Sequence, residues 1–136
     1  MTKNNFYITT PIYYPSAKPH MGHAYSSIVA DFFARFKRIN KYNVFFLTGT
    51  DEHGQKIQRA ALEAKKDTLD FCDEISLNFK DLSAILNLSN DDFIRTTERR
   101  HKKAVENLWN ILEKKNEIYL SKYSGWYSVS DEAFYS

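Results

Sequence analysis

Two histidines flank a glycine near the start of the chain, in the run Pro19-His20-Met21-Gly22-His23. An apolar pattern with helical spacing follows directly, so we expect this run to lie at a helix N-terminus, where unpaired N–H groups and the helix dipole attract phosphate. Histidines at positions i and i+3 share one face, and both can donate hydrogen bonds to phosphate oxygens. Gly22 carries no side chain, which lets a flat ligand lie close to the backbone. The pattern therefore predicts a nucleotide site.

Two other interpretations of the histidine pair stay open at this point. A His-x-x-His pair can bind a metal ion, with Asp51 or His53 as a third ligand. Alternatively, the two histidines have a purely structural role at the start of the helix. The spacing His-x-Gly-His is by itself only moderately specific, so the surrounding elements must decide between these interpretations.

The elements that would position this run form the start of a parallel sheet. Residues 6–10 are β-branched and aromatic and predict a strand, and three prolines then mark a loop over residues 11–20. A helix is predicted from about Met21 to Arg38, because apolar residues recur at steps of four, four and three. These residues are Ile28, Phe32, Phe36 and Ile39.

A second strand is predicted over residues 43–48, which are almost continuously apolar. Strand, helix and strand in this spacing form a βαβ unit, which closes with right-handed parallel connectivity in nearly all proteins. The polar run 49–54 (GTDEHG) follows the second strand directly. Ligands of open α/β sheets bind outside the carboxyl ends of the strands, so the loops 11–20 and 49–54 should meet at one edge.

The sequence after residue 54 predicts two helices, then a strand and a third helix. The final segment differs from these in composition. Helical patterns cover residues 55–65 and a stripe made by Cys72, Ile75, Phe79, Leu82 and Leu86. A short strand is expected at 92–97, followed by a helix lined by Val105, Leu108 and Leu112. Residues 118–136 are rich in Tyr and Ser and predict short strands and turns, so a subdomain should begin near residue 117.

Composition excludes several classes of protein. The 136 residues suit one soluble globular domain, and a net charge of +2 is too small to indicate nucleic-acid binding by itself. The single cysteine, Cys72, rules out an intrachain disulfide or a cysteine-based zinc cluster and is expected as a small core residue. No apolar run approaches the roughly 20 residues of a membrane span, and no signal peptide precedes the first strand. We therefore expect a cytoplasmic protein.

The polar runs resemble the signatures of one family. The sequence TTPIYYP at 9–15, continued by PHMGH at 19–23, resembles the His-x-Gly-His region of methionyl-tRNA synthetases, which are class I aminoacyl-tRNA synthetases. The sequence FLTGTDEHGQKI at 46–57 resembles the second sequence block of that family. Two blocks in the right order and at the right separation make the resemblance specific. A weaker similarity at 123–135, to the start of the family's connective insertion, extends it over essentially the whole chain.

The resemblance implies a role for individual residues. It implies that His20 and His23 contact ATP and stabilise the transition state of adenylate formation, with Gly22 lying against the adenine. It also implies that Asp51 holds the α-ammonium group of methionine, a charge-assisted pairing. The same resemblance places Ile12 and Tyr14 in the pocket for the methionine side chain, where apolar contacts suit a polarizable thioether. It gives no role to His53, and Lys18 and Lys56 are most simply solvated.

The implied activity is that of a methionine–tRNA ligase, which activates methionine with ATP and transfers it to tRNA for protein synthesis. ATP brings Mg²⁺ as part of the substrate, and the implied partners are methionine, ATP and tRNA, without membrane or DNA. No nucleophile from the protein is required, so catalysis would come from positioning and from donors aimed at phosphate charge. A non-catalytic ligand-binding module, another His-x-Gly-His nucleotidyltransferase and a metal-dependent hydrolase remain as alternatives.

The sequence also departs from the family. The Lys-Met-Ser-Lys-Ser loop of the second half-site is not found in these 136 residues. We therefore expect an incomplete, inactive fragment in which residues 1–116 form the first half of a Rossmann-like α/β nucleotide-binding domain. Residues 117–136 would begin the connective insertion. Ser128 and Asp131 stand where many relatives have a cysteine pair that binds zinc, so no zinc is expected from this segment.

Overall fold

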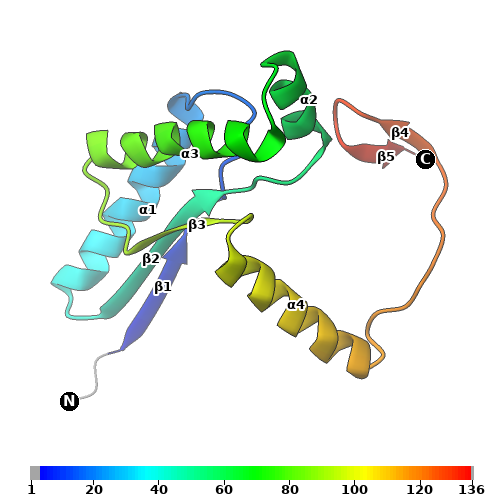
Figure 1. The fold of residues 1–136 in the computed structure, drawn as a ribbon. Helices are drawn as coiled ribbons and strands as arrows, with labels where there is room; N and C mark the ends of the chain where they lie inside the picture. Colours follow the sequence, from blue (N-terminus) through cyan, green and yellow to red (C-terminus); the bar gives the residue numbers. More distant parts are fainter. Residues whose placement is uncertain (1–3, 136) are drawn as a thin grey trace. The chain divides into compact units, whose positions relative to one another are not determined.

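A parallel three-stranded sheet organises the first part of the chain, in a computed structural model that describes residues 4–135. The strands β1 (Asn5–Thr9), β2 (Asn43–Thr50) and β3 (Asp92–Arg95) lie in the order β1-β2-β3 (Figure 1). Tyr7 pairs with Phe45, and Gly49 pairs with Ile94, both in parallel register. The predicted α/β fold with a parallel sheet is therefore confirmed.

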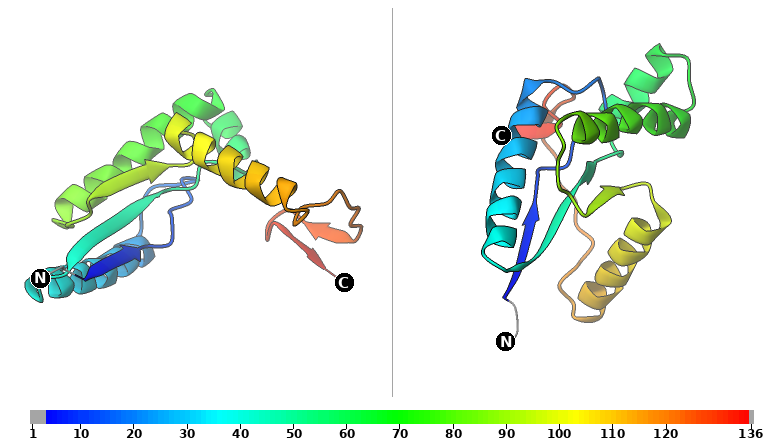
Figure 2. Two further views of the ribbon diagram at one scale, coloured as in Figure 1. Left: turned by 90° about the horizontal axis from the view of Figure 1, so that it is seen from below. Right: turned by 90° about the vertical axis from the view of Figure 1, so that its left-hand side faces the viewer.

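The helices also occur where the apolar periodicity predicts them. They are α1 (Met21–Ile39), α2 (Gln55–Glu63), α3 (Thr68–Ile85) and α4 (Arg99–Lys114). α1 connects β1 to β2, whereas α2 and α3 together connect β2 to β3. Because the strand order is sequential, right-handed crossovers place α1 and α3 on the same face of the sheet (Figure 2).

α1 packs on the sheet through its small residues, not through the apolar stripe that predicts the helix. Ala30 and Ala34 are buried against Phe46 of β2, in a core cluster that Ile8 and Val44 extend. The stripe lies on the exposed side of α1 and comprises Ile28, Phe32, Phe36 and Ile39. The helix is confirmed, but its closest approach to the sheet uses side chains small enough to bring the two backbones together.

Polar contacts tie α1 to the segment between α3 and β3. Asp31, a buried residue of α1, accepts hydrogen bonds from the backbone and hydroxyl of Ser89 at 2.6 and 2.5 Å and pairs with Arg35. Burial acts to raise the pKa of the Asp31 carboxyl, but the hydrogen bonds from Ser89 and Arg35 outweigh it and lower this pKa. Arg38 contacts Asp91 at 2.7 Å. These contacts fix the loop that leads into β3.

A second core cluster lies between α2 and α3. It consists of Ile57, Ala61, Phe71 and Cys72, with Tyr14 packed against it. The predicted position of Cys72 as a small core residue is confirmed. Burial, followed by the negative charge of Glu52 nearby, raises the pKa of the Cys72 thiol to about 11.

The Cys72 thiol should therefore be almost unreactive in the folded protein. With a pKa of about 11, only about one thiol in a thousand is ionised at pH 8, and the thiolate is the reactive form. We expect alkylation by iodoacetamide at pH 8 to proceed at least a hundredfold more slowly than in 6 M guanidinium chloride, as measured by mass spectrometry. Equal rates in the two conditions would contradict the burial of this side chain.

The chain divides into two compact units, Met1–Lys102 and Lys103–Ser136. In the second unit, β4 (Trp126–Ser128) and β5 (Ala133–Tyr135) form an antiparallel hairpin, as the turn-rich composition predicts. The domain boundary expected at residue 117 stays a prediction. Across residues 4–135, none of the helices combines the length and apolarity needed to cross a membrane.

Candidate functional site at the carboxyl edge of the sheet

The loop after β1 is attached directly to the end of β2. Tyr13 donates its backbone N–H to the carbonyl of Gly49 at 2.8 Å, and Asp51 donates its N–H to the carbonyl of Tyr13 at 2.8 Å. Tyr13 and Thr50 form a parallel bridge, so the sheet continues for one residue into the loop. The two polar loops meet at the carboxyl edge, as the strand arrangement predicts.

The two signature histidines form a reciprocal cap at the start of α1. His20 is the N-cap residue, and its Nδ1 accepts a hydrogen bond from the backbone N–H of Gly22 at 3.1 Å. In return, Nδ1 of His23 accepts from the backbone N–H of His20 at 3.1 Å. The imidazole rings are stacked, with their centroids 3.9 Å apart. Both side chains are therefore held at the helix N-terminus.

These hydrogen bonds determine which ring nitrogen carries the proton. Because Nδ1 of each histidine accepts from a backbone N–H, the neutral imidazole must carry its proton on Nε2. Burial, and then the charge of His20, lower the pKa of His23, which favours this neutral form. Two Nε2–H donors at a helix N-terminus suit phosphate oxygens.

Aromatic side chains hold the His23 ring from the loop and from α3. Tyr13 and Phe79 are both buried and stack with centroids 5.0 Å apart, and each meets the His23 ring edge-on, at 5.3 and 5.1 Å. The Ser27 hydroxyl donates to the carbonyl of His23 at 2.7 Å, so the Tyr13 hydroxyl must be the donor in its contact with Ser27. One buried tyrosine thus links the loop, the histidine and the end of β2.

Gly22 leaves space that the His20 ring uses. A Cβ atom at this position would lie 2.9 Å from Cε1 and 3.1 Å from Nδ1 of the His20 ring. A side chain at position 22 would therefore push away the imidazole that caps the helix. Absence of a side chain at this position is needed for the histidine arrangement, whatever ligand binds there.

Asp51 lies at the same edge of the sheet. Its backbone is fixed through Tyr13, but within residues 4–135 its carboxylate makes no hydrogen bond or ion pair. The residue is half-buried.

Of the two residues expected in the methionine pocket, Ile12 is 42% exposed and Tyr14 is half-buried against the cluster of α2 and α3. Their roles remain predictions.

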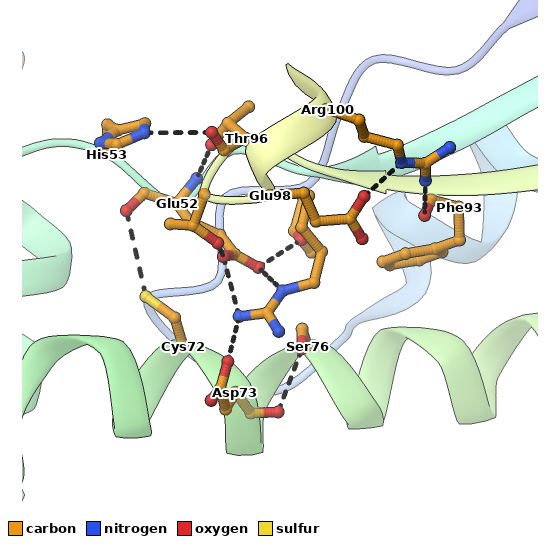
Figure 3. Close-up of polar contacts among 12 residues, drawn as sticks. Glu52, His53, Cys72, Asp73, Ser76, Phe93, Thr96, Glu98 and Arg100 are labelled. Carbon is orange, nitrogen blue, oxygen red and sulfur yellow. Dashed lines mark hydrogen bonds and ion pairs between the residues drawn. The ribbon is translucent and has the colours of Figure 1, made fainter. Parts of the chain in front are cut away.

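Glu52, which follows Asp51 in the chain, has a carboxylate with several hydrogen-bond partners (Figure 3). Its fully buried carboxylate accepts hydrogen bonds from Thr50 at 2.7 Å, from Arg95 at 2.6 and 2.9 Å, and from the Thr97 hydroxyl. Arg95 also contacts Asp73 of α3 at 2.5 Å. These hydrogen bonds, those to Glu52 first, raise the pKa of the Arg95 guanidinium above its usual value.

Three residues of this site were not predicted from the sequence: Tyr13, Glu52 and Arg95. A signal for Arg95 was available, because it ends β3 and the carboxyl ends of parallel strands meet at one edge. A third parallel strand beside β2 therefore places Arg95 next to the run 49–54. The contribution of Tyr13 depends on ring packing, which has no comparable signal in the sequence.

The metal interpretation of the histidine pair requires a third ligand close to the two rings. Within residues 4–135, no group of three or more His, Cys, Asp or Glu side chains is arranged to hold a metal ion. His53 instead donates through Nε2 to the carbonyl of Thr96 at 3.3 Å. In the hairpin, Ser128 donates to the carboxylate of Asp131 at 2.6 Å, so this hydrogen bond holds the turn between β4 and β5.

Comparison with known proteins identifies the family of the chain. Residues 6–136 match the family described as "tRNA synthetases class I (M)". The methionine–tRNA ligase of Listeria monocytogenes is 54% identical over 134 residues, covering 98% of this chain and 20% of the relative. That of Rickettsia prowazekii is 56% identical over 133 residues, covering 98% of this chain and 26% of the relative. This chain thus spans between a fifth and about a quarter of the length of these relatives.

A solved structure is also similar. Mycobacterium tuberculosis methionyl-tRNA synthetase in complex with methionyl-adenylate superimposes with a TM-score of 0.92 at 48% identity, covering 97% of this chain and 26% of that chain. The resemblance found in the sequence is therefore confirmed, and the chain belongs to the methionyl-tRNA synthetase family of class I tRNA synthetases.

Proposed function

We propose that this chain supplies the part of a methionine–tRNA ligase that binds methionine and the phosphates of ATP. The observation that carries the proposal is the pairing of two kinds of group at one sheet edge. His20 and His23 offer Nε2–H donors at a helix N-terminus, and Asp51 offers a carboxylate without a partner among the described residues. An aminoacyl-adenylate has an anionic phosphate and an ammonium group, which these residues complement.

Each residue has a defined role in this proposal. His20 and His23 donate to the phosphate oxygens, and Gly22 lets the adenine approach the backbone. Asp51 accepts from the α-ammonium group of methionine. Ile12 and Tyr14 contact the thioether side chain, whose polarizable sulfur favours aromatic and aliphatic neighbours.

The proposed reaction forms and breaks one bond at phosphorus. A carboxylate oxygen of methionine attacks the α-phosphorus of ATP, and the bond to the β-phosphate oxygen breaks, releasing pyrophosphate. The ribose hydroxyl at the end of tRNA then attacks the carbonyl of the adenylate, and AMP leaves. Mg²⁺ enters with ATP as part of the substrate, and the proposed location is the cytoplasm. The protein contributes positioning and donors for the developing charge on phosphate.

We further propose that residues 1–116 form the first half of the catalytic domain and that residues 117–136 begin its connective insertion. Pyrophosphate-side stabilisation in the family depends on the Lys-Met-Ser-Lys-Ser loop, which these 136 residues do not contain. We therefore expect the chain alone to charge no tRNA. Aminoacylation by the isolated chain would contradict this part of the proposal.

Calorimetric titration of the chain with a sulfamoyl analogue of methionyl-adenylate, which cannot be hydrolysed, tests the binding function. We expect saturable binding to one site, and Asp51→Asn should weaken it about tenfold or more, because a charge-assisted hydrogen bond is lost. The double variant with His20→Ala and His23→Ala should weaken it at least as much.

Matched controls are available in the same chain. Asp81→Asn alters an exposed carboxylate on α3, and His101→Ala removes a histidine of α4 outside the site, so both should bind the analogue like the wild type. Absence of binding by the wild-type chain would refute the proposal. A second titration uses the sulfamoyl analogue of alanyl-adenylate. If it binds with the same affinity as the methionyl analogue, the site does not select methionine, and a general nucleotidyltransferase would be favoured instead.

Replacing the corresponding segment of the Listeria monocytogenes ligase with this chain tests the catalytic contribution. We expect the chimera to support methionine-dependent exchange of pyrophosphate into ATP, and Asp51→Asn in the chimera to raise the KM for methionine more than that for ATP. A folded chimera without exchange activity would show that this chain cannot serve the reaction.

A further inference from the structure

The run that follows β2 contains two adjacent acidic residues with opposite environments. The carboxylate of Glu52 is 0% exposed and is saturated by donors from Arg95, Thr50 and Thr97. The Asp51 carboxylate has no partner among residues 4–135. A buried glutamate with this many donors cannot move without leaving charged groups unpaired, so its backbone position is also restricted.

The backbone on both sides of Asp51 is fixed by hydrogen bonds. The N–H of Asp51 donates to Tyr13 at 2.8 Å, and the N–H of Glu52 donates to the hydroxyl of Thr96 at 2.8 Å. His53 then donates to the carbonyl of Thr96 at 3.3 Å, and the Cys72 thiol approaches the carbonyl of Glu52 at 3.9 Å. Figure 3 shows the contacts of Glu52 and His53 with Thr96, just after β3, and the contact of Glu52 with Cys72 of α3.

The contacts of Arg95 determine whether this guanidinium can pair with the Asp51 carboxylate. Arg95 is 15% exposed, and its guanidinium is engaged with Glu52 and with Asp73 of α3. Because both of these partners are carboxylates other than Asp51, the guanidinium does not neutralise the Asp51 carboxylate. Glu52, in turn, is buried and cannot compete with Asp51 for a cationic group in solvent.

From these contacts we infer that Glu52 and Arg95 are positioning residues that hold the Asp51 carboxylate in place for the α-ammonium group of the amino-acid substrate. The inference rests on the proposed function and adds to it two residues that do not touch the substrate. Asp73 has a secondary role, because its side chain is 56% exposed and it contacts only Nη2 of the guanidinium, which also donates to Glu52.

Comparing two adenylate analogues with and without the α-amino group separates positioning from general stability. The probes are the sulfamoyl analogue of methionyl-adenylate and its desamino counterpart, titrated into the 136-residue chain by calorimetry. Glu52→Gln should weaken binding of the amino compound about tenfold while changing that of the desamino compound less than about twofold. A merely structural role would weaken both compounds equally.

A double-mutant cycle with Asp51→Asn completes the test. In the Asp51→Asn background, adding Glu52→Gln should have almost no further effect on the amino compound, because the group being positioned is already gone. Asp73→Asn is the conservative comparison, with an expected loss of less than about threefold.

The outcomes distinguish the inference from the proposed function. If the wild-type chain binds the amino compound but Glu52→Gln weakens both compounds equally, or neither, the positioning role is refuted while the proposed function stands. If the wild-type chain binds neither compound, the proposed function fails, and the inference fails with it. Circular dichroism of each variant reports whether the fold is retained, and the ratio of the two affinities is independent of the folded fraction.

Discussion

The substitution Gly49→Ala should lower the free energy of unfolding of the chain by more than about 3 kcal/mol, because it forces two paired strands apart. A Cβ atom on residue 49 would lie 1.9 Å from the carbonyl oxygen of Ile94 and 2.7 Å from its Cγ2 atom. Gly49 and Ile94 are register partners in the β2–β3 pair. The added methyl therefore meets backbone, which cannot rotate away as a side chain can.

The magnitude follows from what the neighbouring atoms can do. Overpacked cores usually lose about 1–3 kcal/mol, because side chains change rotamers to make room. At Gly49 the sheet itself must separate, next to the run that carries Asp51. Because the whole stability of a domain is about 5–15 kcal/mol, such a loss is close to global unfolding.

Urea denaturation followed by far-ultraviolet circular dichroism measures the effect. Gly125→Ala is the matched control, since the nearest atom to a Cβ at that position is 3.4 Å away, an ordinary contact. We expect Gly125→Ala to unfold within about 0.5 kcal/mol of the wild type. An unfolding free energy for Gly49→Ala within about 1 kcal/mol of the wild type would contradict the close pairing at this position.

Most of the fold could be predicted from the sequence. The spacing of apolar residues predicts the helices and strands, and their order along the chain predicts how the strands are connected. The βαβ arrangement and its right-handed closure predict, from the sequence alone, that the loops 11–20 and 49–54 lie at one edge. The exposed side of α1 could not be predicted in this way. Periodicity identifies an amphipathic helix, but α1 packs through Ala30 and Ala34, and small residues contribute little to an apolar stripe.

The site was predictable only to the level of residue types. His20 and His23 stand out because histidines at a helix start suggest anion binding, but their mutual capping through Nδ1 depends on backbone geometry. The difference between Asp51 and Glu52 was not predictable either. Both are acidic residues in one polar run, and only the position of Arg95, 43 residues further along the chain than Glu52, distinguishes them.

Arg95→Met is expected to destabilise the chain by about 3–5 kcal/mol, although methionine fills much of the same volume. The carboxylate of Glu52 is 0% exposed, so the substitution leaves a buried charge with hydroxyl donors but no cation. Urea denaturation measures the loss. Lys66→Met is the control, because Lys66 and Glu74 pair at the surface with side chains 42% and 58% exposed, and such pairs contribute at most about 1 kcal/mol.

The double variant Glu52→Gln with Arg95→Met identifies the cause of this loss. If the penalty comes from an uncompensated buried charge, removing that charge should restore a substantial part of the stability, because a neutral amide can still use the hydroxyl donors. If the double variant is less stable than Arg95→Met alone, the guanidinium contributes mainly through packing, and the electrostatic explanation is wrong. We expect the double variant to recover part of the unfolding free energy but to bind the amino adenylate analogue more weakly than the wild type. The recovered stability would then measure the charge balance between Glu52 and Arg95, and the weaker binding would measure their role in positioning Asp51.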